Sequence, residues 1–94
     1  MLTDGNVHAS LEHLNALVKF AEKENISRLN FHLITDGRDS PPTSSINLLK
    51  QLPEVIKKNL ATISGRYWAM DRDKHWDRTQ KYYQTLITEN ANSE

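Results

Sequence analysis

Cysteine is absent from this chain of 94 residues, so disulfides are excluded and a cytoplasmic location is permitted. An excess of charge is also lacking, because twelve basic residues balance twelve acidic ones. We therefore expect neither nucleic acid nor a membrane as a partner, since no global field attracts either. Apolar runs of the roughly 18–20 residues that span a membrane are missing as well. Any anion-binding site must then be built from local charges.

Several familiar chemical motifs are missing too: there is no glycine-rich phosphate loop, no nucleophile elbow and no zinc-ligand pattern. His13, His32 and His75 show no metal-ligand spacing with a carboxylate, so we predict no metal site and no cofactor within this chain. The aromatic residues of a neutral chain are expected to pack in the core rather than stack on bases. The tryptophans and tyrosines concerned are Tyr67, Trp68, Trp76, Tyr82 and Tyr83.

Glycine is scarce, but its three positions form a pattern. The stretches LTDGNVH, ITDGRDS and TISGRYW place glycines at 5, 37 and 65, which lie 32 and 28 residues apart. Each interval fits one strand, one turn and one crossover helix. Because right-handed crossovers bring the carboxyl ends of parallel strands to one edge of a sheet, we expect the three turns on a common rim.

The hydrophobic pattern predicts a small layered α/β fold, with a largely parallel sheet of about three strands and three helices. Strands are predicted at 29–35, buried on both faces, and at 60–64, while 1–3 is interpreted as the end of a strand whose start is missing. The predicted helices cover 8–24, then 43–59 with a break at Pro53, and a last segment capped by Asp73. Residues 66–74 are predicted to form an irregular loop, and 90–94 a frayed tail.

Helix ends and inward faces are also specified by the pattern. Ser10 is a predicted N-cap, and Asn25 is suited to a left-handed helix end. The residues expected to face the core are Leu11, Leu14, Leu17, Val18 and Ala21 in the first helix, and Ile46, Leu48, Leu49, Leu52, Val55 and Ile56 in the second.

Charged side chains follow the predicted glycine turns. The residues expected on the common rim are His8, Arg38, Asp39, Arg66 and, from the loop that follows, Arg72. Arginine presents a planar fork of donors that matches a carboxylate or a phosphate. The rim therefore predicts a small ligand with more than one negative group.

Structural interpretations of the same residues remain open. The arginines can instead pair with Asp36, Asp39, Asp71 and Asp73 and only fix the loops. Asp39 can accept a hydrogen bond from a substrate hydroxyl or move a proton, or it can be a helix N-terminal or turn residue. His8 can donate to an anion, or it can be a surface or capping residue.

Three motifs in this order, TDGNVH, DGRDSPP and SGRYWAMDRDKHWDR, resemble the cofactor-independent (2,3-bisphosphoglycerate-independent) phosphoglycerate mutases. The similarity runs from Leu2 to about Asn90. It implies that residues 1–94 are a single partial domain, part of the phosphotransferase domain that these enzymes insert into a larger alkaline-phosphatase-like domain. Two departures are Thr3-Asp4-Gly5-Asn6 in place of Ser-Asp-Gly-Gly, and Ser10 where the family has a second histidine.

The resemblance also implies roles for the rim residues. His8, Arg38, Arg66 and Arg72 correspond to residues that hold the substrate, and Asp39 to one that orients or deprotonates a glycerate hydroxyl. The implied reaction, in glycolysis and gluconeogenesis, interconverts 3-phosphoglycerate and 2-phosphoglycerate through a phosphoserine. The serine and two divalent metals, usually manganese, are implied to lie outside this chain.

Two hypotheses follow from these observations. The first is a fragment of the mutase that is inactive alone and has the rest of the parent chain as its partner. The second is a freestanding, non-catalytic module that binds phospho-anions. A reading frame that continues into metal-ligand motifs would favour the first. Uncovered sheet edges also predict that the isolated chain self-associates.

Overall fold

The computed structural model describes residues 1–88. The elements in chain order are α1 (Leu11–Lys23), β1 (Phe31–Thr35), α2 (Ser44–Lys50), α3 (Glu54–Lys58), β2 (Leu60–Gly65), α4 (Arg66–Ala69) and α5 (Trp76–Ile87). Among residues 1–88 the α/β class is confirmed, with five helices in place of the three expected. The tail expected at 90–94 lies outside the described residues.

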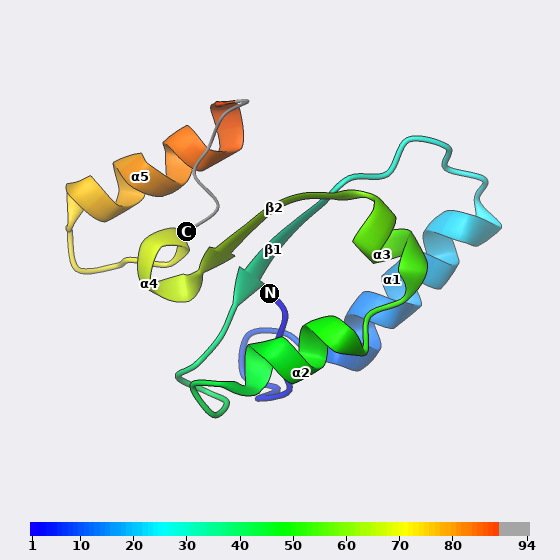
Figure 1. Ribbon diagram of the computed structural model, residues 1–94, viewed down its shortest axis with the longest axis horizontal. Coiled ribbons are helices and arrows are strands. Elements are labelled where there is room, and N and C mark those ends of the chain that lie inside the picture. Colours follow the sequence, from blue (N-terminus) through cyan, green and yellow to red (C-terminus); the bar gives the residue numbers. More distant parts are fainter. Residues whose placement is uncertain (89–94) are drawn as a thin grey trace.

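Two parallel strands, β1 and β2, form the sheet, and their register pairs Thr35 with Gly65. The third strand expected at 1–3 is reduced to a single parallel bridge between Leu2 and Thr35, in which the Leu2 amide donates to the Ile34 carbonyl at 2.7 Å. The three segments that precede the glycine turns therefore end at the same edge of the sheet, beside α4 (Figure 1).

The core lies between the sheet and the first three helices, which Figure 1 shows to one side of the strands. Its buried members are Leu2, Val18, Leu33, Leu48, Leu52 and Ile56. Helices α4 and α5 extend beyond the carboxyl end of β2 and pack mainly on each other. The core therefore fixes the strands, and the strands fix the loops at their ends.

Local signals behave as expected at the helix ends. The Ser10 hydroxyl accepts a hydrogen bond from the His13 amide at 3.1 Å and so caps α1. Asn25 adopts a left-handed φ of 55° after the same helix, and Pro53 occupies the N-cap of α3, where its missing N–H is harmless. These predictions are confirmed.

Two residues expected in the core are exposed instead. Leu17 and Ile46 keep 65% and 59% of their surface accessible to solvent. The buried stripe of α1 runs through Val18 and Ala21, and a step of one residue turns a helix by about 100°, which carries Leu17 off the stripe. Ile46 is turned away from buried Leu48 in the same manner.

The prediction that 29–35 is buried on both faces is wrong. Within β1, Leu33 is buried while His32 is exposed, because the described helices α1 to α3 cover one face. The His32 ring Nδ1 lies 2.8 Å from the Thr62 hydroxyl on the neighbouring strand. Cross-strand pairing thus takes the place of the burial expected for His32.

The structure after β2 also differs from the sequence-based prediction. The expected loop at 66–74 begins with the short helix α4, and α5 has His75, not Asp73, at its N-cap position. Tyr67, Trp76 and Tyr83 are more than half exposed, so the expected aromatic core does not form around them among residues 1–88. No helix in this part of the chain has both the length and the hydropathy needed to cross a membrane.

Candidate anion-binding site

The turn after β1 is folded by one carboxylate. Asp36 Oδ1 accepts the backbone amides of Arg38 at 3.0 Å and Asp39 at 3.2 Å. Between Asp36 and Arg38, Gly37 has a φ of 135°, a conformation that a side chain disfavours. This local closure holds Arg38 and Asp39 in the turn at the end of the strand.

Asp36 is also the point where three chain segments meet. Its side chain is 2% exposed, and it accepts hydrogen bonds from the Thr3 hydroxyl at 2.5 Å and from Arg66 Nη1 at 2.8 Å. Burial by itself would raise the pKa of Asp36, but these bonds and the two amides together hold the pKa well below its usual range. Asp36 is therefore ionised throughout the physiological range.

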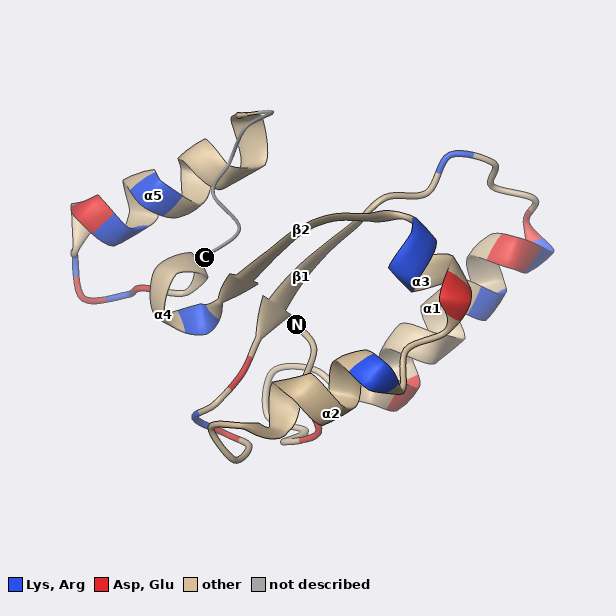
Figure 2. Cartoon of the chain, viewed as in Figure 1, with Lys and Arg blue, Asp and Glu red and all other residues tan. Residues whose placement is uncertain are grey.

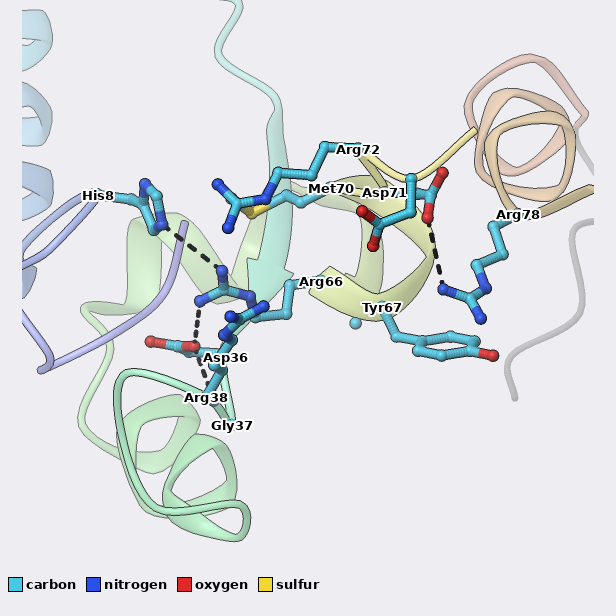
Figure 3. A pocket seen from close by; sticks show the side chains of 12 residues that line it. His8, Asp36, Gly37, Arg38, Arg66, Tyr67, Met70, Asp71, Arg72 and Arg78 are labelled. Carbon is cyan, nitrogen blue, oxygen red and sulfur yellow. Dashed lines mark hydrogen bonds and ion pairs between the residues drawn. The ribbon is translucent and has the colours of Figure 1, made fainter. Parts of the chain in front are cut away.

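Arg66 is held by two carboxylates at once. Its Nη1 donates to Asp36 Oδ1 and, at 2.7 Å, to Asp39 Oδ2, and these bonds raise the pKa of the guanidinium. Its Nη2 lies 3.5 Å from His8 Nε2 (Figure 3). The same His8 atom is 3.5 Å from Asp39 Oδ2. His8, Asp39 and Arg66 thus form one contiguous group drawn from three separate turns.

A cavity of about 500 Å³ opens above this group. Four of the rim residues, His8, Arg38, Arg66 and Arg72, line it, whereas Asp39 lies beside it through its bond to Arg66. The other lining residues are Asp36, Gly37, Gly65, Tyr67, Met70, Asp71, Asp73 and Arg78. Figure 2 shows that acidic and basic residues alternate along both loops that border the cavity.

The arginines of the cavity fall into two kinds. Arg66 forms ion pairs with Asp36 and Asp39, two of the carboxylates expected to pair with the arginines. The side chains of Arg38 and Arg72 are exposed and have no ion-pair partner within residues 1–88. Their charges are available to a ligand, while Arg66 is a fixed positive group beside them.

Sequence reasoning missed several residues of the site. Asp36 was noted only as a partial counter-charge, and Thr3 was given no role there, although the two are joined across the sheet edge. Arg78 went unnoticed, and Tyr67 was assigned to the core, yet both line the cavity. The sequence signal for Asp36 was its place immediately before Gly37, at the end of a strand.

The described residues offer no metal centre, because no group of three or more His, Asp or Glu side chains in this part of the chain is placed to hold an ion. The side chains that line the cavity can form charged hydrogen bonds. The roles expected for the rim residues remain predictions.

The fold and the site define an α/β unit with an arginine-lined cavity at the carboxyl ends of its strands, which is where ligands bind in open α/β sheets. Residues 1–94 match the family model described as BPG-independent PGAM N-terminus, and the chain belongs to this family.

Relatives of this chain carry the name 2,3-bisphosphoglycerate-independent phosphoglycerate mutase. The protein of Symbiobacterium thermophilum is 46% identical over 87 residues, which cover 88% of this chain and 17% of that protein. The protein of Haloquadratum walsbyi is 46% identical over 95 residues, covering 97% and 19%, and that of Prochlorococcus marinus is 42% identical over 95, covering 97% and 18%. The chain thus spans less than a fifth of the length of these relatives.

Proposed function

We propose that this chain is the substrate-holding part of a longer phosphoglycerate mutase that interconverts 3-phosphoglycerate and 2-phosphoglycerate. The observation that carries the proposal is the pair of exposed arginines, Arg38 and Arg72, which line one cavity with the fixed Arg66. Membership of the BPG-independent PGAM N-terminus family supports it. We place this activity in cytoplasmic glycolysis and gluconeogenesis.

The ligand carries a carboxylate and a phosphate, and each suits a bidentate guanidinium contact. Arg38 and Arg72 come from different loops, so the two ends of a three-carbon acid can be bound from two sides. Arg66, already neutralised in part by Asp36 and Asp39, adds a positive charge whose position does not depend on the ligand. A preformed charge lowers the entropy lost when the ligand binds.

Asp39 and His8 supply the remaining chemistry. Arg66 donates a hydrogen bond to Asp39 Oδ2 and so orients the carboxylate. The other oxygen of Asp39 can accept a hydrogen bond or a proton from a glycerate hydroxyl. His8 Nε2 lies between Arg66 and Asp39 at 3.5 Å from each, where it can donate to the anion or to the carboxylate. Both groups act on the glycerate while it remains held.

The phosphoserine and the metals of the proposed reaction are assigned to the rest of the parent chain, as the resemblance to the mutases implies. When bound there, the metals would polarise the phosphoryl group and lower the pKa of the serine. The residues of this chain keep the glycerate in place, so that its other hydroxyl is oriented toward the phosphate.

Calorimetric titration of the chain with 3-phosphoglycerate tests the proposal. We expect binding that Arg72→Ala weakens by about tenfold to a hundredfold, because a hydrogen bond to a charged group contributes about 1.5–3 kcal/mol. Arg28→Ala, an exposed arginine before β1, is the matched control and should leave the affinity unchanged. Absent binding, or equal loss in both variants, contradicts the proposal.

A second assay separates holding from turnover. We expect no mutase activity from the 94-residue chain, with or without manganese, because the serine and metals are assigned elsewhere. Turnover by the purified chain would contradict the assignment of the serine and metals to the rest of the parent chain, even if the titration shows that 3-phosphoglycerate binds.

A further inference from the structure

A second charged network lies on the opposite side of the cavity from Asp36. The Asp71 side chain, 2% exposed, accepts the His75 amide through Oδ2 at 2.9 Å and contacts Arg78 Nη1 through Oδ1 at 3.4 Å. The Arg78 guanidinium lies over the Tyr67 ring, 3.9 Å from its centroid. Asp71 therefore joins α4, α5 and the loop between them (Figure 3).

Arg72 is the next residue after Asp71 in that loop. Its own side chain is exposed and has no ion-pair partner within residues 1–88, and Figure 3 shows it extending toward His8. Two residues further on, Lys74 has a left-handed φ of 63°, so the loop turns sharply before α5. The only side-chain bonds that hold this loop in the described structure are those of Asp71.

Arg78 is poorly placed to bind an anion itself. Its guanidinium already contacts a carboxylate and an aromatic face, and its side chain is 22% exposed. An ion pair combined with stacking fixes a guanidinium more firmly than either contact alone, because its planar group satisfies both at once. Arg78 is thus suited to hold Asp71 rather than a ligand.

We propose that Asp71 and Arg78 are positioning residues that fix the α4–α5 loop and thereby aim Arg72 into the cavity. The inference deepens the proposed function, on which it rests for the identity of the ligand. Fixing the backbone beside Arg72 lowers the ordering entropy that ligand binding must overcome. Neither Asp71 nor Arg78 needs to touch the ligand for this effect.

A thermodynamic cycle between Arg78 and Arg72 tests the inference, with 3-phosphoglycerate as the probe. Arg78→Met removes the ion pair but keeps a long side chain over Tyr67, and we expect it to lower the affinity about tenfold. In an Arg72→Ala background the same change should lower it less than about twofold. Arg78→Lys, which retains the pair with Asp71, should recover part of the affinity. An equal loss in both backgrounds overturns the inference, because it means that Arg78 acts on binding independently of Arg72.

A ligand-free measurement separates this inference from the proposed function. We expect Arg78→Met to increase the hydrogen exchange of the His75 amide and the fast backbone motion of Arg72 measured by NMR relaxation. Arg28→Met is the matched control and should change neither quantity. If the backbone motion of Arg72 is no greater than in the unmodified chain, the positioning role of Arg78 is contradicted, whether or not 3-phosphoglycerate binds. If the motion of Arg72 increases but no variant binds the ligand, the positioning role stands and the proposed function fails.

Discussion

Arg66 and Asp36 are 30 residues apart in the sequence and are joined at 2.8 Å, with Asp36 almost completely buried. The bond ties the end of β2 to the end of β1, and the Thr3 hydroxyl adds the first segment to the same carboxylate. Three turns are therefore positioned by one buried side chain. Loss of this charge affects both the stability of the chain and the geometry of the cavity.

Asp36→Asn removes the charge while retaining the size of the side chain. We expect the free energy of unfolding to fall by about 3 kcal/mol, because Arg66 and two amides lose a buried anionic partner. Urea denaturation measures the change. Asp4→Asn, an exposed residue in the neighbouring turn, is the control and should stay within about 0.5 kcal/mol. Similar values for the two variants would show that Asp36 is not the organising residue.

The pH dependence of stability follows from the same residue. Because folding lowers the pKa of Asp36, its contribution is fully present above the unfolded carboxyl pKa of about 4 and is lost as the pH falls toward the folded value. We expect urea stability to decline below about pH 4, and less steeply in Asp36→Asn. An equally steep decline of urea stability with falling pH in the two proteins would contradict the assignment to Asp36.

Gly5 is in close contact with the backbone of Asp39. A Cβ at Gly5 would overlap the Asp39 carbonyl oxygen and lie 2.8 Å from its carbonyl carbon, so Gly5→Ala must displace the loop that carries Asp39. We expect a loss of about 1–3 kcal/mol in unfolding free energy. Gly65→Ala, whose Cβ meets its nearest atom at 3.8 Å, should be neutral or stabilising by up to about 1 kcal/mol. Equal effects would show that the close approach is unimportant.

Self-association of the isolated chain remains a prediction, and the structure indicates where to test it. Within residues 1–88, β2 pairs only with β1, and α5 exposes Trp76, Tyr83 and Ile87. Such a surface favours burial against another chain. We expect the mass from light scattering to rise with concentration, and to rise less in Trp76→Gln/Ile87→Gln. A monomer across the whole range would contradict this expectation.

Much of the fold could be predicted from the sequence because local patterns determine it. Periodicity located the long helices, and Ser10, Asn25 and Pro53 marked where helices begin or end. The four-residue helix α4 was missed because one turn gives almost no periodic signal. The exposure of Trp76 was missed because burial depends on which elements pack nearby, and few described elements contact α5.

The candidate site was predictable in part for a similar reason. The glycine spacing indicated that His8, Arg38 and Arg66 share a rim, and the cavity contains all three. The division between paired Arg66 and exposed Arg38 could not be read from spacing, because Asp36 pairs with Arg66, 30 residues away, and not with the side chain of nearby Arg38. Side-chain partners across a sheet edge are set by tertiary structure.

The most direct test of the central claim follows the side-chain resonances of His8, Arg38, Arg66 and Arg72 by NMR while 3-phosphoglycerate is added. The account predicts that all four shift together with a single dissociation constant, because three turns contact one ligand. Inorganic phosphate, which lacks the carboxylate, should bind more weakly and shift fewer of them. Shifts confined to one arginine, or separate dissociation constants for different residues, would contradict a shared binding site.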